Sequence, residues 1–193
     1  MIKTLVVATG NPGKLEEMQA YLSEFDIQLQ LKPPEIEVEE TGTTFLENAA
    51  LKAVIVAQKT EQWAIADDSG LVVDALEGAP GLYSARYGST DTERIKRVLR
   101  ELGDNPNRRA KFVCAIALAR PDGSIALQVE GHCPGEILTT PRGEGGFGYD
   151  PIFYVPAEQK TFAQLSRSRK HAISHRGEAF KQLLPQFKQL LNQ

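Results

Sequence analysis

Apolar and polar residues alternate along the chain in blocks that predict strands and helices in turn. Residues 4–8 form a short β-branched apolar run, which is typical of a buried strand. Residues 12–24 carry apolar side chains at helical spacing, and Asn11 stands where a helix N-cap is expected. Leu29 and Leu31 then indicate a second strand. The chain therefore opens with a strand–helix–strand pattern.

Two further helices are marked by capping residues. Thr44 and Glu47 fit a capping box at the start of a long helix that extends to about residue 58. Thr90 and Glu93 fit a second box, and Gly103 is suited to end that helix. The two Thr–Glu pairs therefore predict the first residues of these helices.

Strands are predicted on both sides of two turn-like sequences. Apolar residues 63–66 and 71–73 flank an Asp-Asp-Ser-Gly segment, and we expect Ser69 and Gly70 to turn the backbone there. Residues 111–129 contain two apolar runs of about eight residues around Pro-Asp-Gly, which predicts a long antiparallel hairpin.

The C-terminal part combines a loop with short helices. Residues 141–148 are glycine-rich and predict a loop. Thr161 and Gln164 are expected to cap a short helix, and a last helix is expected over residues 177–191, bent or interrupted at Pro185. The whole pattern predicts an α/β protein with a mixed sheet and helices packed on it. Residues 1–193 are expected to form a single domain with two lobes.

Composition excludes several classes of function. The 193 residues carry a net charge of −3 and 41% hydrophobic residues, so a core can form but no general basic surface for nucleic acid is expected. No apolar run approaches the roughly 18 residues of a membrane helix, and the chain starts without a signal-like segment. Cys114 and Cys133 are interpreted as buried thiols. We expect a cytoplasmic protein without a membrane or nucleic-acid partner.

The segment Ala66-Asp67-Asp68-Ser69-Gly70 carries two adjacent carboxylates at the end of an apolar run. Carboxylates at the end of a strand can hold a divalent metal and activate a water molecule. A plain turn between strands explains the same residues. Glu37, Glu39 and Glu40 add acidic groups, and one of them with Asp68 could form an open Mg²⁺ site that phosphates complete.

The segment Thr9-Gly10-Asn11-Pro12-Gly13-Lys14 joins a strand to a helix N-terminus. Unpaired backbone N–H groups and the helix dipole would favour an anion there, and Lys14 adds a positive charge. The spacing is not that of a Walker A loop, because Leu15 replaces the Ser or Thr that reaches Mg²⁺. A solvated lysine on an ordinary turn remains the alternative to a phosphate site.

The segment from Gly143 to Gly148 formally fits a dinucleotide-binding pattern, but Pro141 and Pro151 stand where a strand and a helix are required. A loop that closely approaches a flat ligand, or a plain flexible loop, fits better. His171 and His175 lie among basic residues, which argues against a metal site. Contact with a phosphate or a base, or a solvated basic face, remains open.

Seven motifs in order resemble the Ham1/RdgB family of inosine triphosphate pyrophosphatases, the non-canonical purine nucleoside triphosphate pyrophosphatases. The resemblance extends from the first strand to the last helix, and no motif position departs from the pattern. The motifs are Thr9-Gly-Asn-x-Gly-Lys14, Glu39-Glu-Thr-Gly42, Phe45-x-Glu-Asn-Ala49, Ala66-Asp-Asp-Ser-Gly70, Gly78-Ala-Pro-Gly-x-Tyr-Ser-Ala-Arg86, Gly145-Gly-Phe-Gly-Tyr-Asp-Pro151 and Ser174-His-Arg-Gly177.

The resemblance implies a Mg²⁺-dependent homodimeric hydrolase that converts XTP, ITP and dITP to the monophosphate and pyrophosphate. It implies an elongated mixed sheet with two lobes around a central nucleotide cleft. It also implies that Asp68 is the proton acceptor and a metal ligand, with Glu39 as a second metal ligand. Implied substrate-binding residues are Thr9, Gly10, Asn11, Pro12, Gly13, Lys14, Ser69, Phe147, Gly148, Tyr149, Asp150, Lys170, His175 and Arg176.

Two other functions remain open from the sequence. A Maf-like pyrophosphatase would act on other modified nucleotides, and a nucleotide sensor would bind without turnover. The adjacent Asp67 is expected either to raise the pKa of one of the two carboxylates or to help orient the metal shell, and the titrations of the pair are expected to be coupled.

Overall fold

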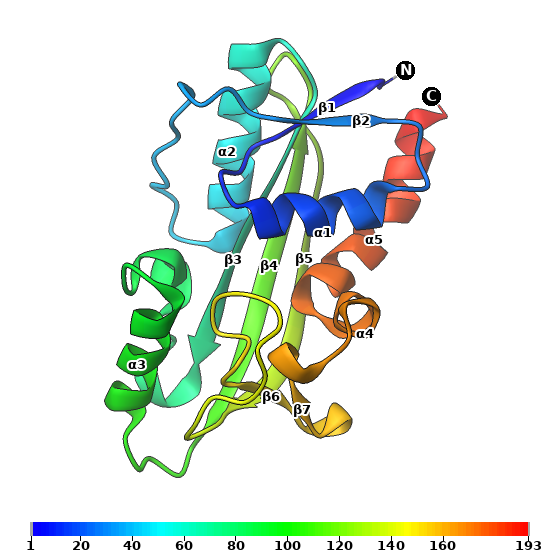
Figure 1. Cartoon of the computed structure of the whole chain (residues 1–193). Helices are drawn as coiled ribbons and strands as arrows, with labels where there is room; N and C mark the ends of the chain where they lie inside the picture. Colours follow the sequence, from blue (N-terminus) through cyan, green and yellow to red (C-terminus); the bar gives the residue numbers. More distant parts are fainter. Residues whose placement is uncertain (1, 193) are drawn as a thin grey trace. The chain divides into compact units, whose positions relative to one another are not determined.

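The computed structural model describes residues 2–192 (Figure 1). The strands of this range form one sheet in the order β2-β1-β3-β4-β5-β6-β7. They are β1 (Thr4–Val7), β2 (Gln28–Leu31), β3 (Ala64–Val73), β4 (Arg109–Ala119), β5 (Ile125–Ile137), β6 (Phe153–Val155) and β7 (Lys160–Thr161). The α-helices are α1 (Pro12–Leu22), α2 (Phe45–Thr60), α3 (Asp91–Leu102), α4 (Arg167–Ile173) and α5 (His175–Leu191).

The sheet is mixed, as the sequence predicts. Strand β1 pairs in parallel with β2 and with β3, so the opening strand–helix–strand unit is confirmed. Strands β5 and β6 pair antiparallel, and so do β6 and β7. Strands β4 and β5 are joined by a tight turn in which the Arg120 N–H donates to the Ser124 carbonyl over 2.8 Å. The predicted hairpin is therefore confirmed, with strands longer than expected.

The expectation of a backbone turn at Ser69-Gly70 is wrong. Strand β3 continues without a break through Asp67, Asp68, Ser69 and Gly70. The apolar residues on both sides of this segment pack in the sheet, so sheet pairing overrides the local turn preference of Asp, Ser and Gly. Asp67 and Asp68 therefore occupy successive positions of a straight strand, where neighbouring side chains point to opposite faces.

Two compact units make up the described chain. Residues 2–68, 114–131 and 176–192 belong to the first unit, and residues 69–113 and 132–175 to the second. Strands β3, β4 and β5 contribute residues to both units. None of the helices within residues 2–192 is long and apolar enough to cross a membrane.

The first unit packs helices on both faces of its sheet. On one face, large residues of β1 and β4 pack against α1 and α5, among them Leu5, Ile116 and Phe180. On the other face, α2 packs through small residues such as Ala53 against the alanines of β4, including Ala117. Helix α2 can approach the sheet closely because both surfaces carry short side chains.

The second unit has a core of its own. Helix α3 packs through Ile95, Val98 and Leu102 against apolar residues that β3 to β6 contribute. The rings of Phe112 and Phe153 lie 4.6 Å apart at the centre of this core. Helix α4 and strands β6 and β7 also belong to this unit, and the sequence pattern did not predict them.

The predicted caps hold with one change of partner. Thr44 and Thr90 each accept a hydrogen bond from the N–H group three residues on, as predicted. The second hydrogen bond of each capping box has a different donor. The Glu47 carboxylate accepts from the N–H of Thr43 instead of Thr44, and the Glu93 carboxylate accepts from the N–H of Ser89 instead of Thr90. Gly103 ends α3 at a positive φ of 48°, as its predicted role requires.

Candidate active site

Asp67 and Asp68 face opposite sides of the first unit's sheet. Ile65, two positions before Asp67, packs with α1 and α5, whereas Ala66, two positions before Asp68, packs with α2. The side chains of a strand alternate between its faces, so Asp67 lies on the α1–α5 side and Asp68 on the α2 side. Their hydrogen bonds agree with this division, since Asp67 accepts from Arg176 and Asp68 accepts from Asn48 and Lys52.

Asp68 is held by two residues of α2. The Asn48 amide donates to Asp68 Oδ2 over 3.3 Å, and Lys52 Nζ donates to Oδ1 over 3.0 Å. Asn48 and Lys52 are four residues apart, so they lie on one face of the helix. Burial is the largest effect on this carboxyl and raises the pKa of Asp68, while Lys52 and Lys14 oppose that rise. Both oxygens of the carboxylate are therefore oriented by donors.

The acidic loop before α2 joins the same cluster through Glu40. Lys52 Nζ lies 2.7 Å from Glu40 Oε1, so one ammonium bridges Glu40 and Asp68. The Gly42 N–H donates to Asn48 Oδ1 over 2.8 Å and fixes the amide that faces Asp68. A Cβ on Gly42 would lie 2.6 Å from that oxygen, which explains the glycine. Glu39, the glutamate expected beside Asp68, is exposed in the same loop.

Asp67 forms a buried ion-pair cluster on the opposite face. Its Oδ2 lies 3.0 Å from Lys14 Nζ and accepts from Arg176 Nη2 over 2.7 Å. Arg176 also donates to Glu17 of α1. The nearby cations outweigh burial and hold the pKa of Asp67 well below its usual range. Asp67 is therefore ionised and fixes Lys14 beside the first loop.

The loop before α1 has the predicted helix cap but fewer unpaired donors than expected. Asn11 Oδ1 accepts from the Gly13 N–H over 2.9 Å and from the Lys14 N–H over 3.4 Å. Thr9 Oγ1 accepts from the Asn11 N–H over 3.1 Å. The expectation that the helix N–H groups stay unpaired is wrong, because Asn11 satisfies two of them. Gly10, Asn11 and Pro12 are exposed, so the loop remains accessible.

The donor chemistry of this unit fits a magnesium ion. Asp68, Glu40 and the exposed Glu39 offer carboxylate oxygens, which are the protein ligands that Mg²⁺ prefers. Across residues 2–192, no group of three His, Cys, Asp or Glu side chains is arranged to hold a metal. A site of one or two carboxylates fits a metal that takes its other ligands from water and substrate phosphates.

Asp150 organises the glycine-rich loop of the second unit. Its Oδ2 accepts from the Phe147 N–H over 3.0 Å and from Lys170 Nζ over 2.6 Å. A Cβ on Gly146 would lie 1.9 Å from that oxygen, and the residue has a φ of +74°, so only glycine fits. The Lys170 ammonium also lies 4.7 Å from the centre of the Phe147 ring. Asp150 and Lys170 together fix this ring.

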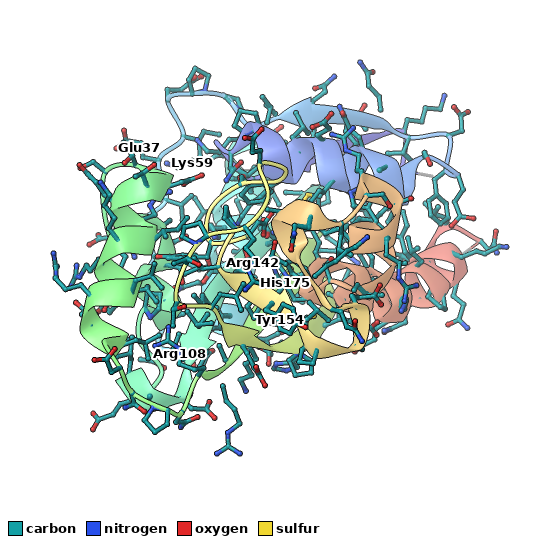
Figure 2. The ribbon with its side chains drawn as sticks, turned by 60° about the horizontal axis from the view of Figure 1, so that its bottom comes forward. Glu37, Lys59, Arg108, Arg142, Tyr154 and His175 are labelled. Carbon is teal, nitrogen blue, oxygen red and sulfur yellow. The ribbon has the colours of Figure 1, made fainter. Side chains whose placement is uncertain are left out.

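The start of the same loop and the start of α5 are also held in place. Thr161 Oγ1 donates to the Arg142 carbonyl over 2.7 Å. The His175 ring stacks on Phe112 at 4.7 Å and is 5% exposed. Arg142 and His175 are labelled in Figure 2.

Ser69 is half-buried on β3. His171 lies in the last turn of α4 and His175 begins α5, so the pair does not share one helix.

Known proteins match this arrangement over almost the whole chain. The sequence profile of the Ham1 family matches residues 5–186. The chain belongs to the Ham1 family. A protein of Nostoc sp. named dITP/XTP pyrophosphatase is 63% identical, with 100% of this chain and 98% of the relative covered. A Synechocystis protein of the same name is 61% identical, with 95% of each covered.

Solved structures of Ham1 proteins have the same fold. The structure of a HAM1 protein from Coxiella burnetii has a TM-score of 0.89 and 44% identity, over 97% of this chain and 100% of that chain. The structure of the Staphylococcus aureus Ham1 protein has a TM-score of 0.86 and 43% identity, over 99% of this chain and 100% of that chain. The α/β fold with a mixed sheet is therefore that of the Ham1 family.

Sequence reasoning missed several residues that hold the family's motifs together. Lys52 lies one helical turn after Asn48, so helical spacing from the Phe45-x-Glu-Asn-Ala49 motif could have found it. Glu17 of α1 is buried against Arg176, a contact between residues 159 positions apart. No local pattern indicates a pair so distant in the sequence.

Proposed function

We propose that this protein hydrolyses the non-canonical purine nucleoside triphosphates XTP, ITP and dITP to the monophosphate and pyrophosphate. The observation that carries the proposal is the Asp68 carboxylate, which two donors orient on β3. The names of the close relatives in Nostoc and Synechocystis support the same substrates. A metal-dependent enzyme is proposed, with Mg²⁺ as the metal.

Asp68 is the proposed proton acceptor. The water oxygen bonds to the α-phosphorus, the bond from that phosphorus to the bridging oxygen breaks, and pyrophosphate leaves with the bonding electrons. The water proton passes to Asp68. Its raised pKa, caused chiefly by burial, suits a general base better than that of an exposed carboxylate. Asn48 and Lys52 would keep the carboxylate oriented during this step.

Asp68 and Glu39 are the proposed residues that would hold Mg²⁺, with Glu40 as an additional carboxylate close to Asp68. The ion would supply positive charge to the phosphates and lower the pKa of the attacking water. Lys52, which lies between Glu40 and Asp68, would have to give up part of its contact when the ion binds. The exposure of Glu39 leaves it available for this role.

The loop from Thr9 to Lys14 is proposed to bind the triphosphate. Lys14 would stabilise the leaving pyrophosphate, and Asp67 would keep its ammonium in position until the substrate arrives. The exposed Gly10, Asn11 and Pro12 and the half-buried Gly13 would surround the phosphates.

The purine is proposed to bind through residues of the second unit. Phe147 would stack on the base, and Gly148 and Asp150 would shape the loop around it. Ser69 is a proposed substrate contact. Lys170 and His175 of the second unit and Arg176 of the first are also proposed substrate-binding residues, and all three are buried. Homodimer formation and a cytoplasmic location remain part of the proposal.

The proposal is tested by the products formed from ITP. We expect IMP and pyrophosphate in equal amounts from the wild-type protein with Mg²⁺. Asp68→Asn should lower kcat by roughly 10²–10⁴-fold, because asparagine cannot accept the proton. Asp26→Asn is the matched control, since Asp26 is an exposed aspartate of the same unit.

Any other result of this experiment would favour a different cleavage position or a different function. Release of IDP and orthophosphate would contradict the proposed cleavage position. Tight binding of ITP without turnover would indicate a nucleotide sensor. Turnover confined to modified nucleotides other than XTP, ITP and dITP would indicate a Maf-like pyrophosphatase. An Asp68→Asn variant with wild-type kcat would exclude Asp68 as the base.

A further inference from the structure

The segment 78–91 contains a motif to which the proposed reaction gives no role. Its 3₁₀ turn, Gly81–Arg86, is built around the buried Ser84. Ser84 Oγ donates to the Gly81 carbonyl over 2.6 Å and accepts from the Leu71 N–H of β3 over 2.9 Å. One hydroxyl therefore closes the turn and attaches it to the strand that carries Ser69.

This segment contacts the glycine-rich loop at two points within the second unit. Tyr149 Oη donates to the Ser84 carbonyl over 2.8 Å, and both residues are buried. Asp91, in the first turn of α3, accepts from the Gly148 N–H through Oδ2 over 2.7 Å. Asp91 Oδ1 lies 2.6 Å from Arg94 Nη1, which keeps its carboxylate in place. Adjacent residues of the loop are thus held by two separate anchors.

Both anchors form hydrogen bonds within the second unit. Tyr149 is 4% exposed and its hydroxyl is used by a backbone carbonyl, so its side chain holds the loop from inside the unit. Gly148 has a φ of +63°, a conformation that side chains other than glycine rarely adopt. A hydrogen bond to its N–H stabilises the backbone directly after Phe147. The position of the Phe147 ring therefore depends on both anchors.

We propose that Tyr149 and Asp91 are positioning residues that determine base specificity by fixing the Phe147 loop. This inference rests on the proposed function, since it assigns the Phe147 ring to the purine. Because both anchors bond to the loop that carries Phe147, we expect them to govern nucleotide binding rather than the chemical step.

The test uses two variants and two independent measurements. Tyr149→Phe removes one hydroxyl and keeps the ring, and Asp91→Ala removes the acceptor for the Gly148 N–H. We expect each to raise KM for ITP by about tenfold, as the loss of a buried hydrogen bond predicts, with kcat at the wild-type value. The preference for ITP over GTP should fall by a similar factor. Amide hydrogen exchange in residues 145–149 should accelerate without any nucleotide.

Tyr154→Phe is the matched control, because Tyr154 lies on β6 of the same unit and outside these two contacts (Figure 2). It should behave as the wild type in both measurements. Unchanged exchange in both variants, or faster exchange with an unchanged KM, would overturn the inference. A fall in kcat at constant KM would overturn it as well. A wild-type protein that does not hydrolyse ITP would refute the proposed function, while the exchange rates would still decide whether the anchors hold the loop.

Discussion

Two neighbouring aspartates on β3 have opposite environments because a strand alternates its faces. Asp67 meets Lys14 and Arg176, and these cations lower its pKa. Asp68 meets Lys52 and an amide, and these contacts do not offset the effect of burial, so its pKa is raised. The first carboxylate is therefore suited to hold cations in place, and the second to accept a proton.

Lys14→Ala tests the role of the ammonium that Asp67 holds. We expect kcat/KM for ITP to fall by roughly 10- to 100-fold, which corresponds to the loss of one charged hydrogen bond to the leaving phosphates. The measurement is steady-state kinetics at fixed Mg²⁺, with circular dichroism to confirm that the variant is folded.

Lys59→Ala provides the control, since Lys59 is an exposed lysine of the last turn of α2 (Figure 2). Its kcat/KM should equal that of the wild type. If Lys14→Ala also retained the wild-type value, the lysine would serve the buried ion-pair cluster and not the substrate.

Single residues of the site were predictable where a motif contained them, but their partners were not. The Asp-Asp pair, Lys14 and the Phe147 loop stood out in the sequence. Which carboxylate meets which cation depended on the strand running straight through Ser69-Gly70, and local turn preferences favoured the opposite outcome. The anchoring role of Tyr149 depended on Ser84, which is 65 positions away.

At the scale of elements, α2 links the core to the site. One stripe of the helix carries fully buried small residues, including Ala49, Ala53 and Ala57. Asn48 and Lys52 project from the same helix toward Asp68. The distance between helix and sheet therefore sets the distance between these donors and the carboxylate.

Ala53→Leu tests this close packing. Three additional carbon atoms at a fully buried position should destabilise the fold by about 1–3 kcal/mol through overpacking, observed as a lower midpoint in urea unfolding. Ala20→Leu on the exposed side of α1 is the control and should leave the midpoint near the wild-type value. Equal midpoints for both variants would show that α2 has room to move away from the sheet.

The β4 strand offers a chemical test of its burial. Cys114 is fully buried on β4, and burial raises the pKa of its thiol to about 12. The thiol is therefore protonated at pH 8, and only the thiolate reacts quickly with iodoacetamide. Peptide mapping should find Cys114 unmodified in the native protein and modified in urea. Rapid labelling of the native protein at pH 8 would contradict the packing of this strand.

Elements with strong periodicity or clear caps were predicted well. Helices α1, α2, α3 and α5 begin within two residues of their expected positions, and the β4–β5 hairpin turns at the expected residues. Helix α4 and strands β6 and β7, which have at most seven residues each, were not predicted. Their positions are set by packing in the second unit.

At the scale of the whole molecule, the two units carry different parts of the proposed chemistry. The first contains the carboxylates and the lysine loop, and the second contains the Phe147 loop. Hydrogen-bond donors directed at a 6-keto group would leave adenine poorly satisfied, since its 6-amino group cannot accept from them. Guanine keeps the keto group and differs at position 2, so its rejection must come from the walls of the base site.

The proposal also predicts that the activity depends on a metal ion. Pyrophosphate release from ITP should stop in excess EDTA and return when Mg²⁺ is added, because the carboxylates and the triphosphate are both negatively charged and need a divalent cation between them. Circular dichroism with and without EDTA should show the same fold, since each unit has its own apolar core. Full activity in EDTA would exclude the proposed metal.

The most direct test of the central claim is kcat/KM for ITP, XTP, GTP and ATP, measured by pyrophosphate release with Mg²⁺. We predict high values for ITP and XTP, strongly reduced values for GTP, and values for ATP reduced by up to about 10⁴-fold. Values within about tenfold of one another for all four nucleotides would contradict a selective base site, since unpaired polar groups should give a larger difference.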